Sequence, residues 1–302
     1  MSFNDKRVWF ITGTSSGLGK ALLEAILEAG ERAVATARKT ELLDYIKDKY
    51  PAEQLLIQQL DVAQKDQILK VFEEIKNHFG RLDIVVNNAG YAVFGEMEAI
   101  SDQDARNQFE VQFWGPVNIT REAVKFFREV NPKGHGGRIF NVSTVGGYDG
   151  RQGLSFYSSS KFALEGFTES VLKEMVPEWN ITGCIIEPGG FETEWNGGSM
   201  VRYPPHPAYA DPSTPTSQFR AMHGSIDLIG VPARFAKAML KIADLPELPR
   251  RIQLGSESLA LVRAKATRTI KDGEKFAEIS HSTNKDGVDV EDYMQKIILA
   301  AQ

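Results

Sequence analysis

The stretch Val8-Trp-Phe-Ile-Thr-Gly13-Thr-Ser-Ser-Gly17-Leu-Gly19-Lys-Ala-Leu22 decides the fold of this chain. It opens with an apolar run short enough for a buried strand, and apolar residues then recur at helical spacing. The stretch therefore predicts a strand, a tight turn and a helix. The three glycines allow the backbone to approach a phosphate group closely, and free N–H groups at the helix start hold negative charge. The alternative is a glycine-rich turn in an α/β protein that binds no nucleotide.

Apolar runs and helical patterns alternate along the rest of the chain. The predicted strands cover 7–12, 32–37, 55–60, 83–87, 137–142, 181–187 and 251–254. The predicted helices cover 17–29, 40–49, 64–79, 101–130, 155–176 and 232–243. This alternation is typical of a parallel sheet that is covered by helices on both faces.

Tyr157 and Lys161 are four residues apart within one predicted helix. That spacing places both side chains on one helix face, where the lysine ammonium can lower the pKa of the phenol from about 10 towards working pH. A tyrosine with such a neighbour can act as a general acid or base. Taken alone, a tyrosine and a lysine at this spacing are usually an amphipathic residue and a solvated charge.

Four motifs in this order resemble the short-chain dehydrogenase/reductase family. They are Thr12-Gly-x-x-x-Gly-x-Gly19, Asn87-Asn88-Ala89-Gly90, Tyr157-x-x-x-Lys161, and Pro188-Gly189 with Thr193. The resemblance runs from about residue 5 to about residue 255. It implies an α/β fold with a Rossmann-type, doubly wound parallel sheet in three layers, α/β/α. It also implies hydride transfer with a nicotinamide cofactor.

The resemblance also assigns residues to the cofactor. In the glycine-rich turn these are Gly13, Ser15, Ser16, Gly17, Leu18 and Gly19. The others are Asp61 with Val62 at the adenine, Asn88, Ala89 and Gly90 at the ribose, and Pro188, Gly189 and Thr193 at the nicotinamide side. Tyr157 and Lys161 are implied to touch the cofactor as well as to carry the catalysis.

Two positions depart from the family pattern. The substrate-binding serine of the family is replaced by Thr144, although Ser143 beside it is the alternative. Threonine keeps the hydroxyl, while its methyl group narrows the pocket. The family's asparagine, which organises a proton-relay water, is replaced by Gln112. Glutamine has the same donors and acceptors on a longer stem, so we expect an altered relay.

The end of the second strand governs the choice of cofactor. Ala37 and Arg38 stand where a protein using NAD has an acidic residue for the ribose 2′-hydroxyl, whereas an arginine accommodates the 2′-phosphate of NADP. We therefore expect NADP, with NAD less favoured. The alternative is that Arg38 is only a solvated strand end.

Residues 195–230 combine five prolines with interleaved aromatic residues, which indicates an ordered substrate lid within the 1–255 domain. We expect an apolar or aromatic pocket built from six side chains: Tyr91, Val93, Phe94, Phe191, Trp195 and Tyr203. Residues 256–302 extend beyond the family resemblance. Their apolar spacing predicts a helical C-terminal extension packed on the same domain.

Composition limits the alternatives. The 302 residues are 42% hydrophobic with a net charge of −5, which offers no general attraction to nucleic acid or to an anionic membrane. The chain begins without an apolar signal segment, so we expect a cytoplasmic protein. Cys184 lies in an apolar strand and is expected to be a buried thiol, and the scattered histidines predict no metal site.

These observations favour an NADP-dependent oxidoreductase that interconverts a ketone and a secondary alcohol, in the manner of a carbonyl reductase. The alternative is a catalytically idle nucleotide-binding regulator on the same fold. A dehydratase or epimerase is less favoured, because such proteins usually carry a longer separate substrate domain. The family resemblance implies a homodimer or homotetramer.

Overall fold

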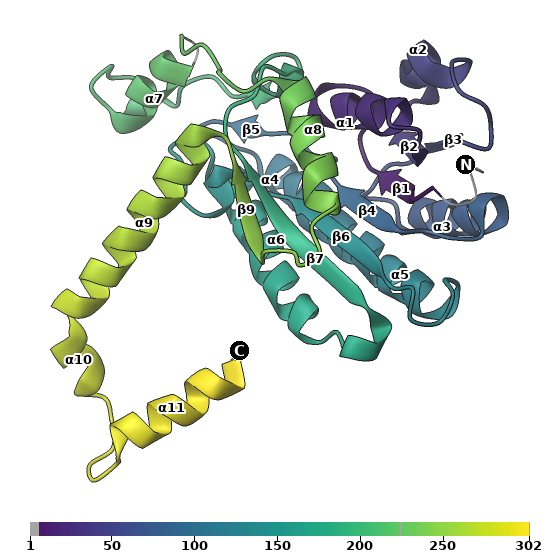
Figure 1. Cartoon of the computed structure of the whole chain (residues 1–302). Coiled ribbons are helices and arrows are strands. Elements are labelled where there is room, and N and C mark those ends of the chain that lie inside the picture. The colour runs from purple at the N-terminus through teal and green to yellow at the C-terminus, as the bar shows by residue number, and fades with distance from the viewer. Residues whose placement is uncertain (1–5, 224, 302) are drawn as a thin grey trace. The chain divides into compact units, whose positions relative to one another are not determined.

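The structure is a computed structural model that describes residues 6–223 and 225–301. A seven-stranded parallel sheet forms its centre, in the order β3-β2-β1-β4-β6-β7-β9 (Figure 1). The strands are β1 Val8–Ile11, β2 Arg32–Ala37, β3 Leu55–Gln59, β4 Ile84–Asn87, β6 Gly137–Val142, β7 Ile181–Pro188 and β9 Arg251–Leu254. The strand order reverses between β1 and β4. This is the Rossmann-type doubly wound sheet that the sequence predicted.

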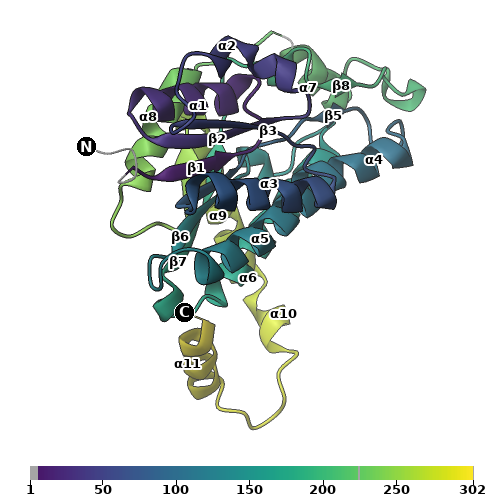
Figure 2. The ribbon, with the colours of Figure 1, turned by 90° about the vertical axis from the view of Figure 1, so that its right-hand side faces the viewer.

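Helices cover both faces of this sheet, as the two views together show (Figures 1 and 2). The helices of the first face are α1 Gly17–Glu28, α2 Asp44–Lys47 and α8 Pro232–Ala243. The helices of the second face are α3 Lys65–Phe79, α5 Gly115–Glu129 and α6 Ser155–Lys173. Helix α4 Asp102–Phe109 precedes α5. The three-layer α/β/α prediction is therefore confirmed.

The strands alternate between two cores because successive side chains point to opposite faces of a sheet. Trp9 and Ile11 of β1 pack with the apolar faces of α1 and α8. Val8 and Phe10 pack with α3 and α5 on the other side. All four side chains are fully buried, as expected for a central parallel strand.

The predicted helix 101–130 is wrong as a single element. It consists of α4, a π-helical turn at Glu110–Trp114, and α5. The sequence also gave no warning of β5 Val93–Phe94 and β8 Val201–Arg202, which pair in parallel as a separate two-stranded sheet. Both strands are too short to show a period of two.

The predicted lid 195–230 is ordered in its described residues. Besides β8 it contains α7 Pro215–His223, which begins at a proline, where the missing N–H costs no helical hydrogen bond. Arg220 of α7 forms an ion pair with the buried Glu96 at 3.0 Å and donates to the Tyr203 carbonyl at 2.9 Å. The pairing of β8 with β5 and this ion pair hold the lid to the segment after β4.

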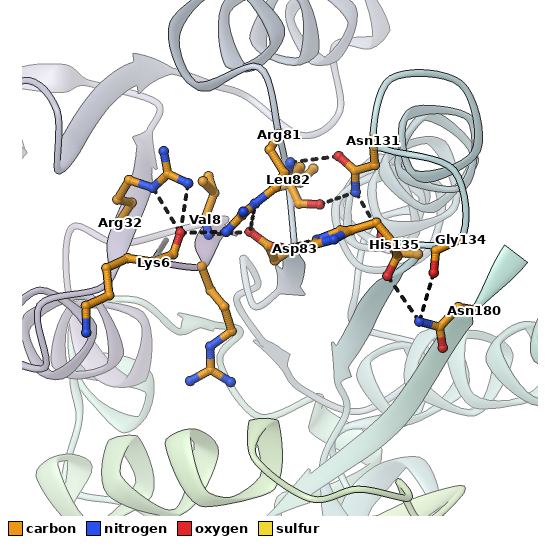
Figure 3. Close-up of polar contacts among 12 residues, drawn as sticks. Lys6, Val8, Arg32, Arg81, Leu82, Asp83, Asn131, Gly134, His135 and Asn180 are labelled. Carbon is orange, nitrogen blue, oxygen red and sulfur yellow. Dashed lines mark hydrogen bonds and ion pairs between the residues drawn. The ribbon is translucent and has the colours of Figure 1, made fainter. Parts of the chain in front are cut away.

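At the amino ends of the strands, polar side chains form a dense network (Figure 3). Asp83 accepts from the backbone N–H of Val8 at 2.7 Å and from Arg81 Nε at 3.0 Å, and its other oxygen lies 2.5 Å from His135 Nε2. Asn131 uses its whole amide, accepting from Leu82 N and donating to Leu82 O and Gly136 O.

The chain divides into two compact units between Val262 and Arg263. The predicted boundary at 255/256 falls earlier, where α9 Ser256–Lys275 begins. The smaller unit holds the rest of α9, α10 Ala277–His281 and α11 Val290–Ala301. That this extension packs on the same domain stays a prediction. Across the described ranges, no helix has the length and apolar character needed to span a membrane.

Candidate active site

The four sequence motifs meet at the carboxyl ends of the central strands, beside the reversal between β1 and β4. Thr12, at the end of β1, joins two of them: its hydroxyl accepts from Asn88 N at 3.0 Å and Ala89 N at 2.9 Å. The Asn88 side chain donates back to the carbonyls of Thr12 and Gly13. Ligands of open α/β sheets bind at such a reversal.

Two glycines of the turn are required by backbone conformation. Gly13 and Gly17 have φ values of +71° and +56°, a region that residues with a side chain rarely adopt. Gly19 is required by packing, because a Cβ there would overlap the Gly13 carbonyl and the Asn88 amide. The turn thus brings the bare backbone to the first residues of α1.

The start of α1 can receive an anion. Ser16 is its N-cap residue but makes no side-chain capping hydrogen bond, and the first turn contains no acidic residue. The N–H groups at this end and the helix dipole favour a negative group. These features fit the pyrophosphate of a dinucleotide, with Ser15, Ser16 and Leu18 in the same turn.

The remaining residues assigned to the cofactor lie around this turn. Arg38 is exposed directly after β2, and the side chain of Thr193 contacts Gly17. Asp61 forms a local turn by accepting from Ala63 N at 3.0 Å, with the buried Val62 beside it. Gly189 contacts Glu257 so closely that a side chain at this position would overlap that carboxylate.

Tyr157 and Lys161 of α6 are both buried at this end of the sheet. Burial raises the pKa of the Tyr157 phenol to about 12 and lowers the pKa of Lys161 to about 8. The Lys161 ammonium donates to the Val142 carbonyl at 2.8 Å. The pKa of the phenol is therefore raised, opposite to the expected lowering by Lys161, because desolvation is the largest cause of the shift.

The two candidate hydroxyls before Tyr157 have different partners. Ser143 is buried and donates to Glu165 Oε1 at 2.5 Å, so its hydroxyl is turned into the protein. The Thr144 hydroxyl lies near enough to the Tyr157 phenol to lower the pKa of that phenol, and it also accepts from Gly146 N at 3.3 Å. Of the two alternatives, only Thr144 presents a hydroxyl beside the phenol.

Trp195, from the lid, also contacts the phenol. Its ring centroid lies 5.5 Å from that of Tyr157, and its proximity lowers the pKa of the phenol. A backbone bond from Trp195 N to Thr193 Oγ1, 3.3 Å long, fixes the start of the lid. The sequence indicated Trp195 as a pocket residue but gave no sign that it contacts the candidate acid.

Gln112 lies in the π-helical turn and is completely buried. Its Nε2 donates to Ser160 Oγ at 3.3 Å, and Ser160 in turn donates to the Tyr157 carbonyl at 2.8 Å. Gln112 Oε1 has no hydrogen-bond partner among the described residues and lies over Gly90. An orphaned, buried acceptor beside the catalytic helix suits a relay water, which is the role that the family's asparagine implies.

The six predicted pocket residues do not form one cluster. Phe94 and Trp195 pack beside Tyr157, together with three residues that the sequence analysis missed: Leu154, Met200 and Phe219. Tyr91, Val93 and Tyr203 belong to a neighbouring cluster. Phe191 packs against Phe235 in the main core. The error arose because the lid crosses β5, so that alternate residues of the lid and strand face different clusters.

A buried charged group behind Lys161 was also missed. Glu165, Glu187 and Ser143 are each at most 4% exposed, and Arg251 reaches the first two from β9. A warning was present in the sequence, since Glu187 interrupts an otherwise apolar strand. Cys184 in the same strand is a buried thiol, as expected. Within 6–223 and 225–301, no group of three or more His, Cys, Asp or Glu residues could hold a metal ion.

Comparison with known proteins shows which family this chain is similar to. The family model described as short chain dehydrogenase matches residues 7–200. Uncharacterized oxidoreductase C162.03 of Schizosaccharomyces pombe is 36% identical over 92% of each chain. Oxidoreductase calM of Penicillium decumbens is 36% identical over 90% of this chain and 91% of its own.

Solved structures give the same result. A short-chain dehydrogenase from Streptomyces avermitilis superposes with a TM-score of 0.82 at 30% identity, covering 94% of this chain and all of its own. A short chain dehydrogenase from Burkholderia cenocepacia in complex with NADP has a TM-score of 0.69 at 21% identity, covering 91% of this chain and 98% of its own. At that lower identity the likeness shows the fold alone.

Proposed function

The chain belongs to the short-chain dehydrogenase family of oxidoreductases, and on that premise we propose that it reduces a ketone to a secondary alcohol with NADPH. One observation carries the proposal: Tyr157 lies beside the Thr144 hydroxyl and one helical turn from Lys161, at the end of the sheet where the glycine-rich turn begins. A phenol, a hydroxyl and an ammonium so placed are the parts of a proton donor for a carbonyl oxygen.

Each residue has a defined task in this reaction. The nicotinamide, when bound, supplies the hydride. Tyr157 donates its proton to the carbonyl oxygen, and Thr144 polarises that oxygen through its hydroxyl. Lys161 stabilises the phenolate left on Tyr157, because an opposite charge inside a dry site acts strongly. Gln112 would hold the relay water that returns a proton to this group.

The cofactor preference rests on Arg38. Its guanidinium is the cation at the end of β2, where a 2′-phosphate would lie, and neither Ala37 nor Lys39 beside it is acidic. Charge-assisted bonds from arginine to phosphate are strong and directional. Several solved neighbours are complexes with NADP, which supports the same choice.

The substrate is proposed to be apolar or aromatic. The cluster beside the phenol consists of Phe94, Leu154, Met200 and Phe219, with Trp195 packed against it. Such a surface favours a hydrocarbon or aryl substituent next to the carbonyl. A charged substrate would lose hydration here without gaining a partner.

The test is NADPH oxidation by the purified protein with a panel of aryl ketones and matched short aliphatic ketones. We expect turnover that is faster with the aryl ketones, together with the alcohol as product. Turnover with NADH exceeding that with NADPH would contradict the cofactor proposal. Tight NADPH binding without turnover of any carbonyl would favour the idle regulator instead.

A further inference from the structure

Behind the catalytic helix, a single glycine lies against the side chains of Ser143, Glu165 and the aliphatic stem of Lys161. If Gly147 carried a Cβ, it would overlap Ser143 Oγ and Glu165 Oε1, and it would lie 3.1 Å from Lys161 Cβ. Gly147 is buried in the short helical turn that follows Thr144. The chain thus has no side chain at this point, and the three groups come together there.

Glu165 is connected in two directions from this point. It lies four residues after Lys161 on α6, so both side chains occupy one helix face, and both are buried. Its Oε1 accepts from Ser143 at 2.5 Å, and Ser143 is the residue directly before Thr144. The charge of Glu165 therefore acts electrostatically on the Lys161 ammonium. Its hydrogen bond with Ser143 holds the backbone next to Thr144, the proposed substrate-binding residue.

Four other charged or titratable groups lie around Arg251. They are Glu169 of α6, Glu187 of β7, Arg251 of β9 itself, and the phenol of Tyr148, whose ring lies 5.1 Å from the Arg251 guanidinium. Cys184 of β7 is neutral, because burial raises the pKa of its thiol to about 12. Arg251 alone balances the carboxylates of Glu165, Glu187 and Glu169.

Lys161 lies beside this group of carboxylates. Glu165, Glu169 and Glu187 share the Arg251 guanidinium, and the charge of Glu165 also favours the protonated form of the buried Lys161. A buried ammonium with no anionic neighbour would lose its proton readily.

We propose that Glu165 is a positioning residue of the active site, whose carboxylate keeps Lys161 charged and, through Ser143, fixes the start of the loop that carries Thr144. The proposal rests on the function assigned above to Lys161 and Thr144. Glu165 itself touches neither substrate nor cofactor in this role. Its influence is read through the proton on Lys161.

The sign of the effect follows from the charges. Burial lowers the pKa of Lys161 to about 8, while the Glu165 charge raises it. Glu165→Gln keeps the shape and an acceptor for Ser143 but removes the charge, so the pKa of Lys161 falls further. Lys161 must be protonated to stabilise the phenolate, so activity is lost at a lower pH than in the unmodified protein.

The experiment compares Glu165→Gln with the matched control Glu169→Gln. Glu169 lies on the same helix and pairs with the same Arg251, yet its side chain is 44% exposed, and the Ser143 hydroxyl donates to Glu165 instead. We expect Glu165→Gln to move the alkaline limb of kcat/KM for ketone reduction down by about one pH unit, which is about tenfold in rate above the limb. Glu169→Gln should leave the alkaline limb at the pH of the unmodified protein. Glu165→Asp keeps the negative charge, so its alkaline limb should lie close to that of the unmodified protein.

A second readout needs no turnover. The proton on Lys161 is followed directly by NMR titration of lysine ammonium groups, with the signal assigned from a Lys161→Met variant. We expect the same downward displacement in Glu165→Gln and none in Glu169→Gln. An unmoved limb together with an unmoved Lys161 titration would overturn the proposal. If the unmodified protein reduces no ketone, the function fails, yet the titration still decides the role of Glu165.

Ser143→Ala is the reserve variant if Glu165→Gln does not fold. Burial is the largest cause that raises the pKa of Glu165 to about 7, and the Ser143 hydrogen bond acts in the opposite direction. Without that bond Glu165 is neutral over a wider range, so the Lys161 titration must move in the same direction by a smaller amount. A shift in the opposite direction, or none, would overturn the proposal.

Discussion

Buried polar groups at the two ends of the central sheet differ in how completely they are hydrogen-bonded, although Trp9 Nε1 of β1 also has no partner among the described residues. At the amino ends, Asp83 and Asn131 have partners for every group that they offer (Figure 3). At the carboxyl ends, Asn87 Oδ1, Gln112 Oε1 and Glu257 Oε2 have no hydrogen-bond partner in the described part of the chain. Buried acceptors without a partner are costly, so they persist where function needs them.

This difference indicates that the amino end of the sheet contributes mainly to stability and that the carboxyl end contributes mainly to ligand binding and catalysis. Saturated networks fix one arrangement and leave nothing for a ligand to bind. The carboxyl end instead combines orphaned acceptors with bare glycine backbone and a free helix start. Substitutions at one end should therefore change stability, and substitutions at the other should change activity.

The largest effect is expected from Tyr157→Phe. Losing the proton donor should lower kcat by about 10²- to 10⁴-fold, or about 3 to 5 kcal/mol, while NADPH binding and the unfolding midpoint stay close to those of the unmodified protein. Steady-state kinetics, cofactor titration and thermal unfolding check the three parts. A folded variant with near-normal kcat would remove Tyr157 from the mechanism.

The converse change is Asp83→Ala at the amino ends. It orphans the Val8 N–H and removes the partner of Arg81 and His135, which should destabilise the protein by about 2 to 3 kcal/mol. The partial exposure of Arg81 and His135 keeps the loss below that of a fully buried pair. Urea unfolding measures it, with the exposed Asp48→Ala as control.

Activity per folded molecule should be unchanged in Asp83→Ala. A large fall in kcat at constant stability would contradict the division between the two ends. It would mean that the amino end communicates with the phenol across the sheet.

Much of this arrangement could be predicted from the sequence. The seven strands were predicted because buried parallel strands are continuous apolar runs, and 32–37, 137–142 and 251–254 match the structure at both ends. The motifs could be predicted to lie together because the carboxyl ends of parallel strands share one edge. The π-helical turn at Gln112 could not be predicted from the sequence, since no residue pattern distinguishes it from an α-helical turn.

The electrostatics of the site also lay beyond the sequence. The spacing of Tyr157 and Lys161 indicated a lowered phenol pKa, yet desolvation dominates and depends on tertiary packing. Glu165 meets Arg251 only because β9 returns beside β7, a pairing that no local pattern shows. The lid's division into two apolar clusters depends in the same way on the short β5–β8 pair.

Arg38→Asp separates cofactor binding from catalysis at the carboxyl end of the sheet, since this substitution should affect cofactor binding alone. Replacing the cation by an acid should weaken NADPH binding by about 2 kcal/mol and narrow its advantage over NADH. The residue is exposed, so stability should not change. Fluorescence titration with both cofactors measures the difference, with Lys39→Asp as the neighbouring control. An unmodified protein that prefers NADH would contradict this role.

Gln112 gives the smallest and most informative effect, because its orphaned oxygen is the clearest mark of the carboxyl end. If that oxygen holds a relay water, Gln112→Ala should lower kcat by about tenfold, as expected for one lost water-mediated contact in a relay. Gln112→Asn keeps the amide on a shorter stem and should lose less. The relay also predicts that the solvent isotope effect on kcat rises in Gln112→Ala, because proton return then limits the rate more strongly. A fall in the isotope effect would contradict the relay. Asn118→Ala, six positions further along the same chain segment in α5, tests the alignment: damage there with an unaffected Gln112→Ala would show that the relay position lies in a different register.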